Sequence, residues 1–207
     1  TGFEVHWGTT IYFYGEFDRK PSALVNDGKE RVFTFGSQPG TVRFRYAISL
    51  ISSAQAKASL RREIPGWDLD KIAAAGRAAW NERLGKVRVE GGTDDQKTVF
   101  YTALYRCYER MIDITEDGRY CGWDKKIHAA DGVRQYTDDW SWDTYRAAHP
   151  LMTILEPEAQ AAKLTSYLRF AAQTKEGWVP TFPALGEDAH CMNGFHTVSL
   201  FLDAWRK

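Results

Sequence analysis

The chain has few cysteines, no long apolar run and no excess of one charge, and each absence narrows what it can be. Among its 207 residues, three cysteines are too few and too scattered for a disulfide scaffold. One disulfide beside a free thiol is possible, and so are three reduced thiols. No stretch approaches the roughly 20 apolar residues that a membrane span needs. With 27 basic and 27 acidic residues and no long run of one sign, nucleic acid is not expected as a partner. The cysteines are Cys107, Cys121 and Cys191.

The first residues, TGFEVHWG, lack the charged and apolar regions of a signal peptide, so any export signal is expected to have been removed upstream. Aromatic side chains are abundant instead, at 14% of the chain with eight tryptophans. Packing in a large core explains most of them. It explains less well the tryptophans in or beside connections rich in Gly and Asp. These are Trp123, Trp140, Trp142 and Trp178.

The start of the chain has the alternating pattern of β-strands. In TVRFRYAISL (41–50), apolar side chains occupy every second position, which predicts a strand with one buried face. TIYFYGEF (10–17) and RVFTFG (31–36) predict two more strands. The chain offers no further strand, and three strands need a second layer to cover them. Residues 1–53 are therefore predicted to be the C-terminal part of a β-sandwich domain. The predicted buried face of 41–50 consists of Val42, Phe44, Tyr46, Ile48 and Leu50.

After Ser53 the pattern becomes helical. The segments 53–64 and 69–87 are rich in helix formers and predict two helices of a linker that spans residues 54–92. Thr93 and Gln96 form a capping box at the start of a third helix, 93–111. That helix carries apolar side chains on two sides, which predicts burial between neighbours.

Three more helices are predicted at 141–155, 157–175 and 194–206. Pro150 is expected to bend or interrupt the first, and Pro157 stands at the favoured first position of the second. The long connections 112–140 and 177–193 are uncommon without a function. Helices that alternate with such loops predict a toroid in which the polar and aromatic loop residues gather on one rim. The helix positions expected to be buried are Ala161, Leu164, Leu168 and Ala171, then Phe195, Val198, Leu202 and Trp205.

The stretch DDWSWDTYRAAHP (138–150) crowds acids and tryptophans at the start of a helix. Acids are expected there for capping and for the helix dipole alone, and Asp143 could pair with Arg146 on the helix surface. Indole faces beside carboxylates and a guanidinium are also what a carbohydrate subsite requires, because sugar C–H groups pack on the ring. Both explanations stand for Asp143, whereas capping is the better explanation for Asp138 and Asp139.

Two further loops carry residues suited to a site. In GWVPTFPALGEDAHCMNGFH (177–196), Glu187 and Asp188 could act as a general acid and base, although adjacent acids usually point apart. A metal site is not predicted there, because the spacing of its His and Cys residues fits no usual pattern. In DGRYCGWDKKIH (117–128), the polar and aromatic residues either line the same rim or only fold the loop, and the second is favoured. Those residues are Tyr120, Trp123, Asp124 and His128.

At these segments the sequence resembles glycoside hydrolase family 92, the exo-acting α-mannosidases. The resembling blocks follow the family's order: TIYFYGEF, AWNERLGKVRVEGG, KTVFYTALYR, DGRYCGWDKKIH, WSWDTYRAAHPL and GWVPTFPALGEDAHCMNG. The resemblance implies an N-terminal β-sandwich, linker helices and an (α/α)6 barrel, of which residues 93–207 form the N-terminal part. It also implies calcium-dependent hydrolysis of terminal α-mannose from glycans, with inversion, by a secreted or periplasmic enzyme.

The resemblance divides the site between this segment and the remainder of the polypeptide. The family's general acid lies in a motif resembling EGNAWQ and its base in one resembling GNDD, and neither occurs here. Both motifs and the calcium ligands are expected downstream, so no catalytic residue and no metal ligand is predicted in this segment. What remains is part of the rim that binds a mannose-containing glycan, while Asp138 and Asp139 order the loop. The predicted substrate-binding residues are Trp142, Asp143, Arg146, Trp178, Glu187, His190 and Asn193.

Three alternatives stay open beside this hypothesis. Another (α/α)-barrel glycosidase would act on glucose or other sugars. A non-catalytic glycan-binding protein would bind mannose without calcium and without turnover. A helical interaction scaffold would have no affinity for sugar.

Overall fold

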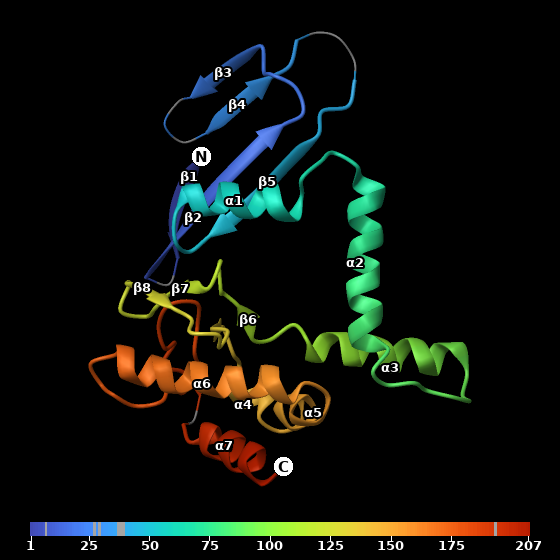
Figure 1. Ribbon diagram of the computed structural model, residues 1–207, viewed down its shortest axis with the longest axis vertical. Helices are drawn as coiled ribbons and strands as arrows, with labels where there is room; N and C mark the ends of the chain where they lie inside the picture. The colour runs from blue at the N-terminus through green and yellow to red at the C-terminus, as the bar shows by residue number, and fades with distance from the viewer. Residues whose placement is uncertain (7, 27, 29, 37–39, 193) are drawn as a thin grey trace.

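The computed structural model describes residues 1–6, 8–26, 28, 30–36, 40–192 and 194–207. Strands come first along the chain and most helices follow (Figure 1). The main sheet lies at one end of the molecule and the last helices lie at the other. The fold is therefore a mixture of α and β elements in the predicted order. The predicted boundaries at residues 53 and 92 stay predictions.

The main sheet has three antiparallel strands in the order β1–β2–β5, and a separate hairpin pairs β3 with β4. The strands β2, β4 and β5 confirm the three predicted strands, with bounds that differ by a few residues. The expectation of no further strand is wrong, because β1 and β3 were missed. Both are short, almost entirely exposed and held by backbone pairing. β3 lacks apolar alternation, and in β1 the alternation of Phe3 and Val5 with polar residues covers only five residues. The bounds are β1 (Gly2–His6), β2 (Thr9–Phe17), β3 (Ala23–Asn26), β4 (Arg31–Thr34) and β5 (Phe44–Ser49).

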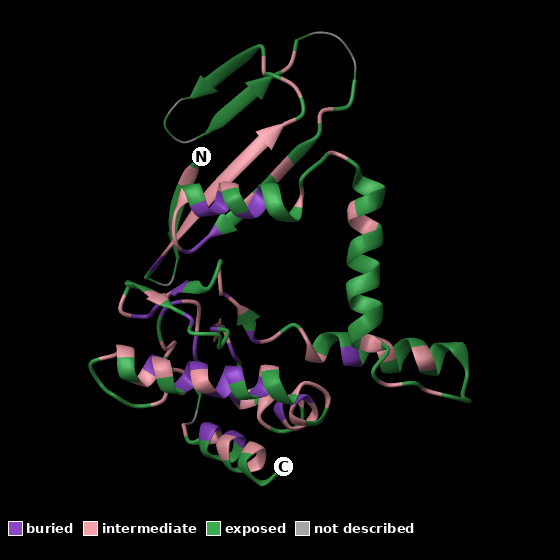
Figure 2. Cartoon of the chain, in the orientation of Figure 1, coloured by how far each residue is buried: buried purple, intermediate pink, exposed green. Residues whose placement is uncertain are grey.

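The predicted buried face of β5 is the open one. Phe44, Tyr46 and Ile48 are 47%, 56% and 58% exposed, and of the five predicted positions only Leu50 is buried. The helix α1 (Ser53–Glu63) contacts β2 and β5 on the opposite face, where Arg45 pairs with Glu16 at 2.7 Å. Figure 2 shows the sheet largely in the colours of exposed and intermediate residues. Alternation therefore identified the strand, but within the described chain no second sheet covers its apolar side.

The helices α2 (Leu69–Leu84) and α3 (Asp94–Cys107) run along one side of the molecule (Figure 1). Thr93 caps α3, and the side chain of Gln96 completes the predicted capping box. The expected burial of α3 on two sides is wrong for the described residues. Leu104 is its one buried residue there, because its neighbour α2 covers only part of it.

The long connection 112–140 is not structureless. It contains two small antiparallel sheets, β6 (Ile112–Asp113) with β9 (Tyr136–Thr137), and β7 (Arg119–Cys121) with β8 (Ile127–Ala129). The connection lies between the main sheet and α6 (Pro157–Gln173) (Figure 1) and is hydrogen-bonded to α6 through the Tyr136 N–H and the Ala130 carbonyl.

The predicted helix 141–155 is two helices, α4 (Ser141–Thr144) and α5 (Ala148–Leu155). The break lies before Pro150 and not at it, which corrects the expected cause. Pro150 sits in the first turn of α5, where its missing N–H has no helical partner to lose.

The helix α6 (Pro157–Gln173) begins with Pro157 as predicted, but its buried face differs from the predicted one. Leu164 is buried as predicted, whereas Ala161 and Leu168 are exposed and Ala171 is half-buried. The buried face is partly polar, and its polar side chains find hydrogen-bond partners on neighbouring segments, which apolar periodicity could not show. Its members are Gln160, Ala162, Lys163, Leu164, Ser166, Tyr167 and Phe170.

The helix α7 (His196–Arg206) buries Thr197 and Leu200. Its predicted apolar face is open instead, with Trp205 88% exposed. The core of this half of the chain forms between α6, α7 and the connection 112–140, and in it Trp123 stacks on Phe170 at 4.1 Å. Its buried members are Met111, Trp123, Leu164, Tyr167, Phe170 and Leu200, while Phe195, Val198 and Leu202 of the predicted face are exposed.

The three cysteines are free, which favours the reduced alternative. None of the helices in the described part of the chain has the length and apolar character that crossing a membrane requires.

Candidate functional site

The first predicted group lies on α4 and the turn that follows it. Asp143 and Arg146 are exposed, and Trp142 is half-buried with its ring edge-on to His196 at 5.1 Å. The Arg146 guanidinium lies 6.0 Å from the Trp142 ring. No hydrogen bond or ion pair occupies the Asp143 side chain within the described residues, so it does not pair with Arg146. The group therefore presents an indole, a carboxylate and a guanidinium on one short segment.

The second predicted group lines a pocket of about 300 Å³. Trp178 is 62% exposed, and Glu187 and His190 are exposed beside it. Asn193 lies outside the described residues. The remaining walls come from the connection 112–140, the end of α6 and the loop that follows it. Those walls are Trp123, Lys125, Gln173, Thr174, Lys175, Glu176, Pro180, Gly186 and Asp188.

Asp188 is engaged within its own loop. Its carboxylate accepts hydrogen bonds from the backbone N–H groups of Thr181 (2.8 Å), Phe182 (3.0 Å) and His190 (3.1 Å). Glu187, the next residue, points to solvent at the pocket. The two acids therefore do different things, and the acid–base pair that their adjacency suggested does not form here.

One wall of the pocket is built by residues far apart in the chain. The Lys125 ammonium donates to the Gly186 carbonyl at 2.8 Å and to the Thr9 hydroxyl at 3.3 Å. Gly186 approaches so closely that a Cβ there would lie 1.6 Å from Thr9 Oγ1. The start of β2 thus abuts this wall of the pocket. Sequence reasoning named the neighbours of Lys125 but missed Lys125 itself, because a lysine in a polar loop carries no distinguishing pattern.

The third predicted group mainly folds its own loop, as favoured from the sequence. Tyr120 is buried and stacks on His128 at 5.3 Å, and His128 contacts Asp124 at 2.9 Å. Burial acts to raise the pKa of Asp124, but the hydrogen bond with His128 and neighbouring groups outweigh it, so the pKa is lowered. Only Trp123 of this group reaches the pocket.

Asp138 and Asp139 both order the segment that enters α4. Asp138 pairs with Arg110, whose guanidinium lies 4.3 Å from the Trp140 ring. Asp139 is fully buried and accepts hydrogen bonds from Thr144, His149 and Tyr167. Burial alone would raise the pKa of Asp139, but the hydrogen bonds and the charge of His149 outweigh it and lower that pKa.

Hydrogen bonds join the segments that carry the two predicted groups. The Ser141 hydroxyl donates to the Thr181 carbonyl, and the Asp139 N–H donates to the Pro183 carbonyl at 3.0 Å. The Thr137 hydroxyl donates to the Ala184 carbonyl at 2.8 Å. The pocket at Trp178 is not lined by Trp142, Asp143 or Arg146. The segments that carry the two groups are therefore held side by side by hydrogen bonds.

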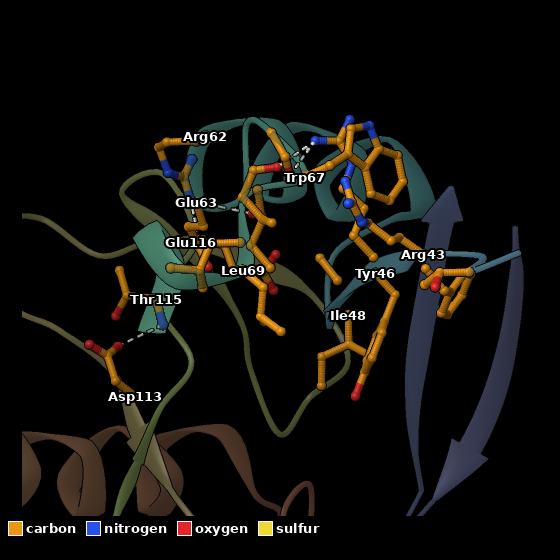
Figure 3. Close-up of a pocket in the computed structure, with 18 residues that line it drawn as sticks. Arg43, Tyr46, Ile48, Arg62, Glu63, Trp67, Leu69, Asp113, Thr115 and Glu116 are labelled. Atoms are coloured by element: carbon orange, nitrogen blue, oxygen red, sulfur yellow. Dashed lines mark hydrogen bonds and ion pairs between the residues drawn. The ribbon is translucent and has the colours of Figure 1, made fainter. Parts of the chain in front are cut away.

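A cavity of about 950 Å³ lies elsewhere and is not the candidate site. It opens between β5, the α1–α2 connection and residues 113–116 (Figure 3). Tyr46 and Ile48 line one side, with Leu69 and Glu116 on the other. It is continuous with the open apolar face of the sheet, and none of the predicted substrate-binding residues lines it.

The described residues do not fit a calcium site. They contain no group of three or more His, Cys, Asp or Glu side chains placed to hold a metal ion. We therefore derive no chemical step through calcium from this segment.

Comparison with known proteins identifies the family of the chain. Residues 55–207 match the glycosyl hydrolase family 92 catalytic domain, and the chain belongs to that family. A family 92 alpha-mannosidase from Bacteroides thetaiotaomicron, also solved with mannoimidazole, superposes with a TM-score of 0.85 at 29% identity. An inverting mannosidase of the same family and organism gives a TM-score of 0.83 at 31% identity.

The chain is shorter than these relatives. It is covered to 93% and 98% by the two solved mannosidases but spans only 29% and 30% of their chains. A secreted glycosidase of Arthroderma benhamiae (strain ATCC MYA-4681 / CBS 112371) is 35% identical over 81 residues, which is 37% of this chain and 10% of that protein.

Proposed function

We propose that this chain is part of an exo-α-mannosidase and contributes to the surface that binds terminal α-mannose of glycans. The observation that carries the proposal is the pocket in which Trp178, Glu187 and His190 stand exposed. An exposed indole beside hydrogen-bonding groups suits a sugar ring, which offers apolar C–H faces and a rim of hydroxyls. The family of the chain and its mannosidase neighbours support mannose as the sugar.

The proposed division of labour places bond cleavage outside this segment. In an inverting glycosidase one carboxylic acid protonates the leaving oxygen while a carboxylate about 6.5–9.5 Å away activates water. Among the described residues, Asp139 and Asp188 are engaged in structural hydrogen bonds, and we assign sugar binding to the exposed carboxylates of Asp143 and Glu187. We assign the acid, the base and the ligands of an expected calcium ion to the remainder of the polypeptide.

The proposed architecture explains the open faces of this chain. Residues 1–53 would end a β-sandwich whose second sheet covers Phe44, Tyr46 and Ile48. Residues 54–92 would be the linker, and residues 93–207 the first part of an (α/α)6 barrel whose further helices cover α3 and α7. An apolar surface of this extent on a soluble domain marks a contact with other protein. A secreted or periplasmic location belongs to the same proposal, supported by the secreted relative.

The test is a panel of aryl glycosides offered to the intact protein that contains this chain. We expect turnover of the α-mannoside, β-mannose as the first product by NMR, and loss of activity with a calcium chelator. Preference for an α-glucoside would favour another (α/α)-barrel glycosidase. Mannose binding without turnover and without calcium would indicate a glycan-binding protein, and absence of sugar affinity a helical scaffold.

A variant connects this activity to the pocket. Trp178→Ala should raise KM for the α-mannoside by roughly 5- to 30-fold, as expected when 1–2 kcal/mol of binding free energy is lost. Trp178→Phe, which keeps an aromatic face, should recover part of that loss. A KM unchanged in both folded variants would contradict sugar binding at this pocket.

A further inference from the structure

The buried carboxylate of Asp139 joins three helices. Its oxygens accept hydrogen bonds from Thr144 Oγ1 of α4 (2.8 Å), His149 Nε2 of α5 (2.7 Å) and the Tyr167 hydroxyl of α6 (2.5 Å). Asp139 and Tyr167 are 0% exposed and His149 is 3% exposed. All three partners donate to the carboxylate, so an ionised Asp139 satisfies every one of them, whereas a neutral amide lacks the charge that strengthens these hydrogen bonds.

The second nitrogen of His149 extends the network. His149 Nδ1 lies 3.0 Å from Nε2 of Gln160, which is 1% exposed. With Nε2–H donating to Asp139, Nδ1 accepts from the Gln160 amide N–H when the ring is neutral and donates to Gln160 Oε1, 3.1 Å away, when the ring is charged. The ionised Asp139 thereby fixes Nε2 of His149 as a donor, and Gln160 can satisfy Nδ1 in either protonation state of the ring.

The helix that this network holds is very short. The helix α4 has four residues, no side-chain cap, and backbone bonds from Asp143 and Thr144 to the Trp140 carbonyl. A single turn of helix is not stable alone, because its nucleation costs more than one or two hydrogen bonds return. Its neighbours α5 and α6 have 8 and 17 residues and can serve as a frame.

We propose that Asp139 is a positioning residue, which fixes α4 against α5 and α6 so that Trp142, Asp143 and Arg146 are presented to the sugar. This inference rests on the proposed mannose-binding function. Asp139 touches no substrate, since it is buried, and acts through the helix that it anchors. Its backbone N–H also bonds to Pro183, so the same residue aligns α4 with the loop that carries Glu187 and His190.

The experiment compares Asp139→Asn with wild type in the intact protein. Misplacing a binding group by 1 Å can cost roughly 100-fold, so we expect kcat/KM for the α-mannoside to fall about 10- to 100-fold, mostly through KM. Hydrogen exchange should accelerate at the amides of residues 143–145 more than in α6. The ¹⁵N signals of His149 should shift, because its Nε2–H then donates to a neutral amide oxygen and no longer to a carboxylate. The matched control is Asp203→Asn, which removes a carboxylate from a surface pair with Lys207 and should change none of these.

Each outcome decides a separate question. Unchanged kcat/KM in a folded Asp139→Asn protein, or exchange accelerated equally along the whole chain, would overturn the positioning role. If Asp139→Asn does not fold, Tyr167→Phe keeps the buried ring and removes one donor. Unchanged KM and unchanged exchange at residues 143–145 in that variant would overturn the inference equally. An inactive wild type contradicts the mannosidase proposal instead, while the exchange and the His149 signals still test the anchoring of α4.

Discussion

Lys125 and Gly186 are joined across the pocket wall, with the ammonium of one donating to the carbonyl of the other at 2.8 Å. The same ammonium reaches the Thr9 hydroxyl at the start of β2. One side chain thus connects the sheet, the connection 112–140 and the loop 177–192. The wall of the proposed sugar pocket depends on both halves of the chain.

Removing the Lys125 ammonium should therefore loosen the pocket. Lys125→Met keeps most of the aliphatic stem and removes the donor, leaving the buried Thr9 hydroxyl and the Gly186 carbonyl with one partner fewer. We expect a loss of about 1 kcal/mol in unfolding free energy, measured by denaturant titration. Lys126→Met is the matched control, because that neighbouring lysine side chain is 78% exposed. Equal stability of the two variants would contradict the bridging role.

Gly186→Ala should destabilise the protein by about 1–3 kcal/mol, the usual range for overpacking. The added Cβ would meet Thr9 Oγ1 at 1.6 Å and the Lys125 ammonium at 2.9 Å. Gly76→Ala within α2 is the matched control, since nothing lies within 4 Å of its added Cβ. Alanine favours helix over glycine, so the control should stabilise slightly. The melting temperature distinguishes the two variants. An unchanged melting temperature for Gly186→Ala would show that the pocket wall can accommodate the added methyl group.

Asp143→Ala in the intact enzyme should lower kcat/KM for an α-mannoside by about 10-fold, as expected for the loss of a hydrogen bond to a charged group. The carboxylate is exposed and has no side-chain partner in the described chain, so it is available to sugar hydroxyls. Asp70→Ala removes another acid from the first turn of a helix and controls for the helix dipole. Unchanged kinetics in a folded Asp143→Ala protein would restore the capping explanation.

The unfolding free energy should depend on pH in the direction set by the lowered pKa of Asp139. Its pKa is lowered on folding, so its contribution is present above the unfolded value near 3.8 and is lost as pH falls through the lower folded value. Unfolding free energies measured from pH 2.5 to 7 should therefore fall on the acid side less steeply in Asp139→Asn than in wild type. Parallel curves would contradict an ionised Asp139 in the folded state.

Glu116 should affect the pH dependence of the unfolding free energy in the opposite direction. Burial raises its pKa, so its contribution is present at low pH and is lost as pH rises through the folded pKa. Glu116→Gln should thus remove a loss of unfolding free energy that sets in above the unfolded pKa near 4.5, and an unchanged curve there would contradict this contribution.

The sequence predicted which segments form the main elements better than it predicted which sides are covered. The capping box at Thr93 and the proline at the start of α6 act through local backbone chemistry, and both were confirmed. The exposed sides of β5 and α7 depend on what packs against them, which local periodicity cannot supply. On α6 the buried side includes Gln160 and Lys163, whose partners belong to other segments.

The candidate site shows the same division. Aromatic and acidic residues in Gly-rich loops pointed to Trp178 and Glu187, and the structure places both at one pocket. The sequence could not show that the Asp188 carboxylate binds backbone N–H groups of its own loop. Nor could it show that Lys125 bridges Thr9 and Gly186 in the pocket wall. Both depend on three-dimensional contacts between side chain and backbone carbonyl or N–H groups, and any polar loop residue can make such contacts.

The sequence separation of these contacts has a consequence for the order of folding. The Asp139 network links residues 5, 10 and 28 positions apart, whereas Lys125 reaches Thr9 across 116 positions. Closing a longer loop loses more chain entropy and forms contacts later. We therefore expect the anchor of α4 to assemble early and the Thr9–Lys125–Gly186 wall to close last, as the sheet docks onto a half that is already folded.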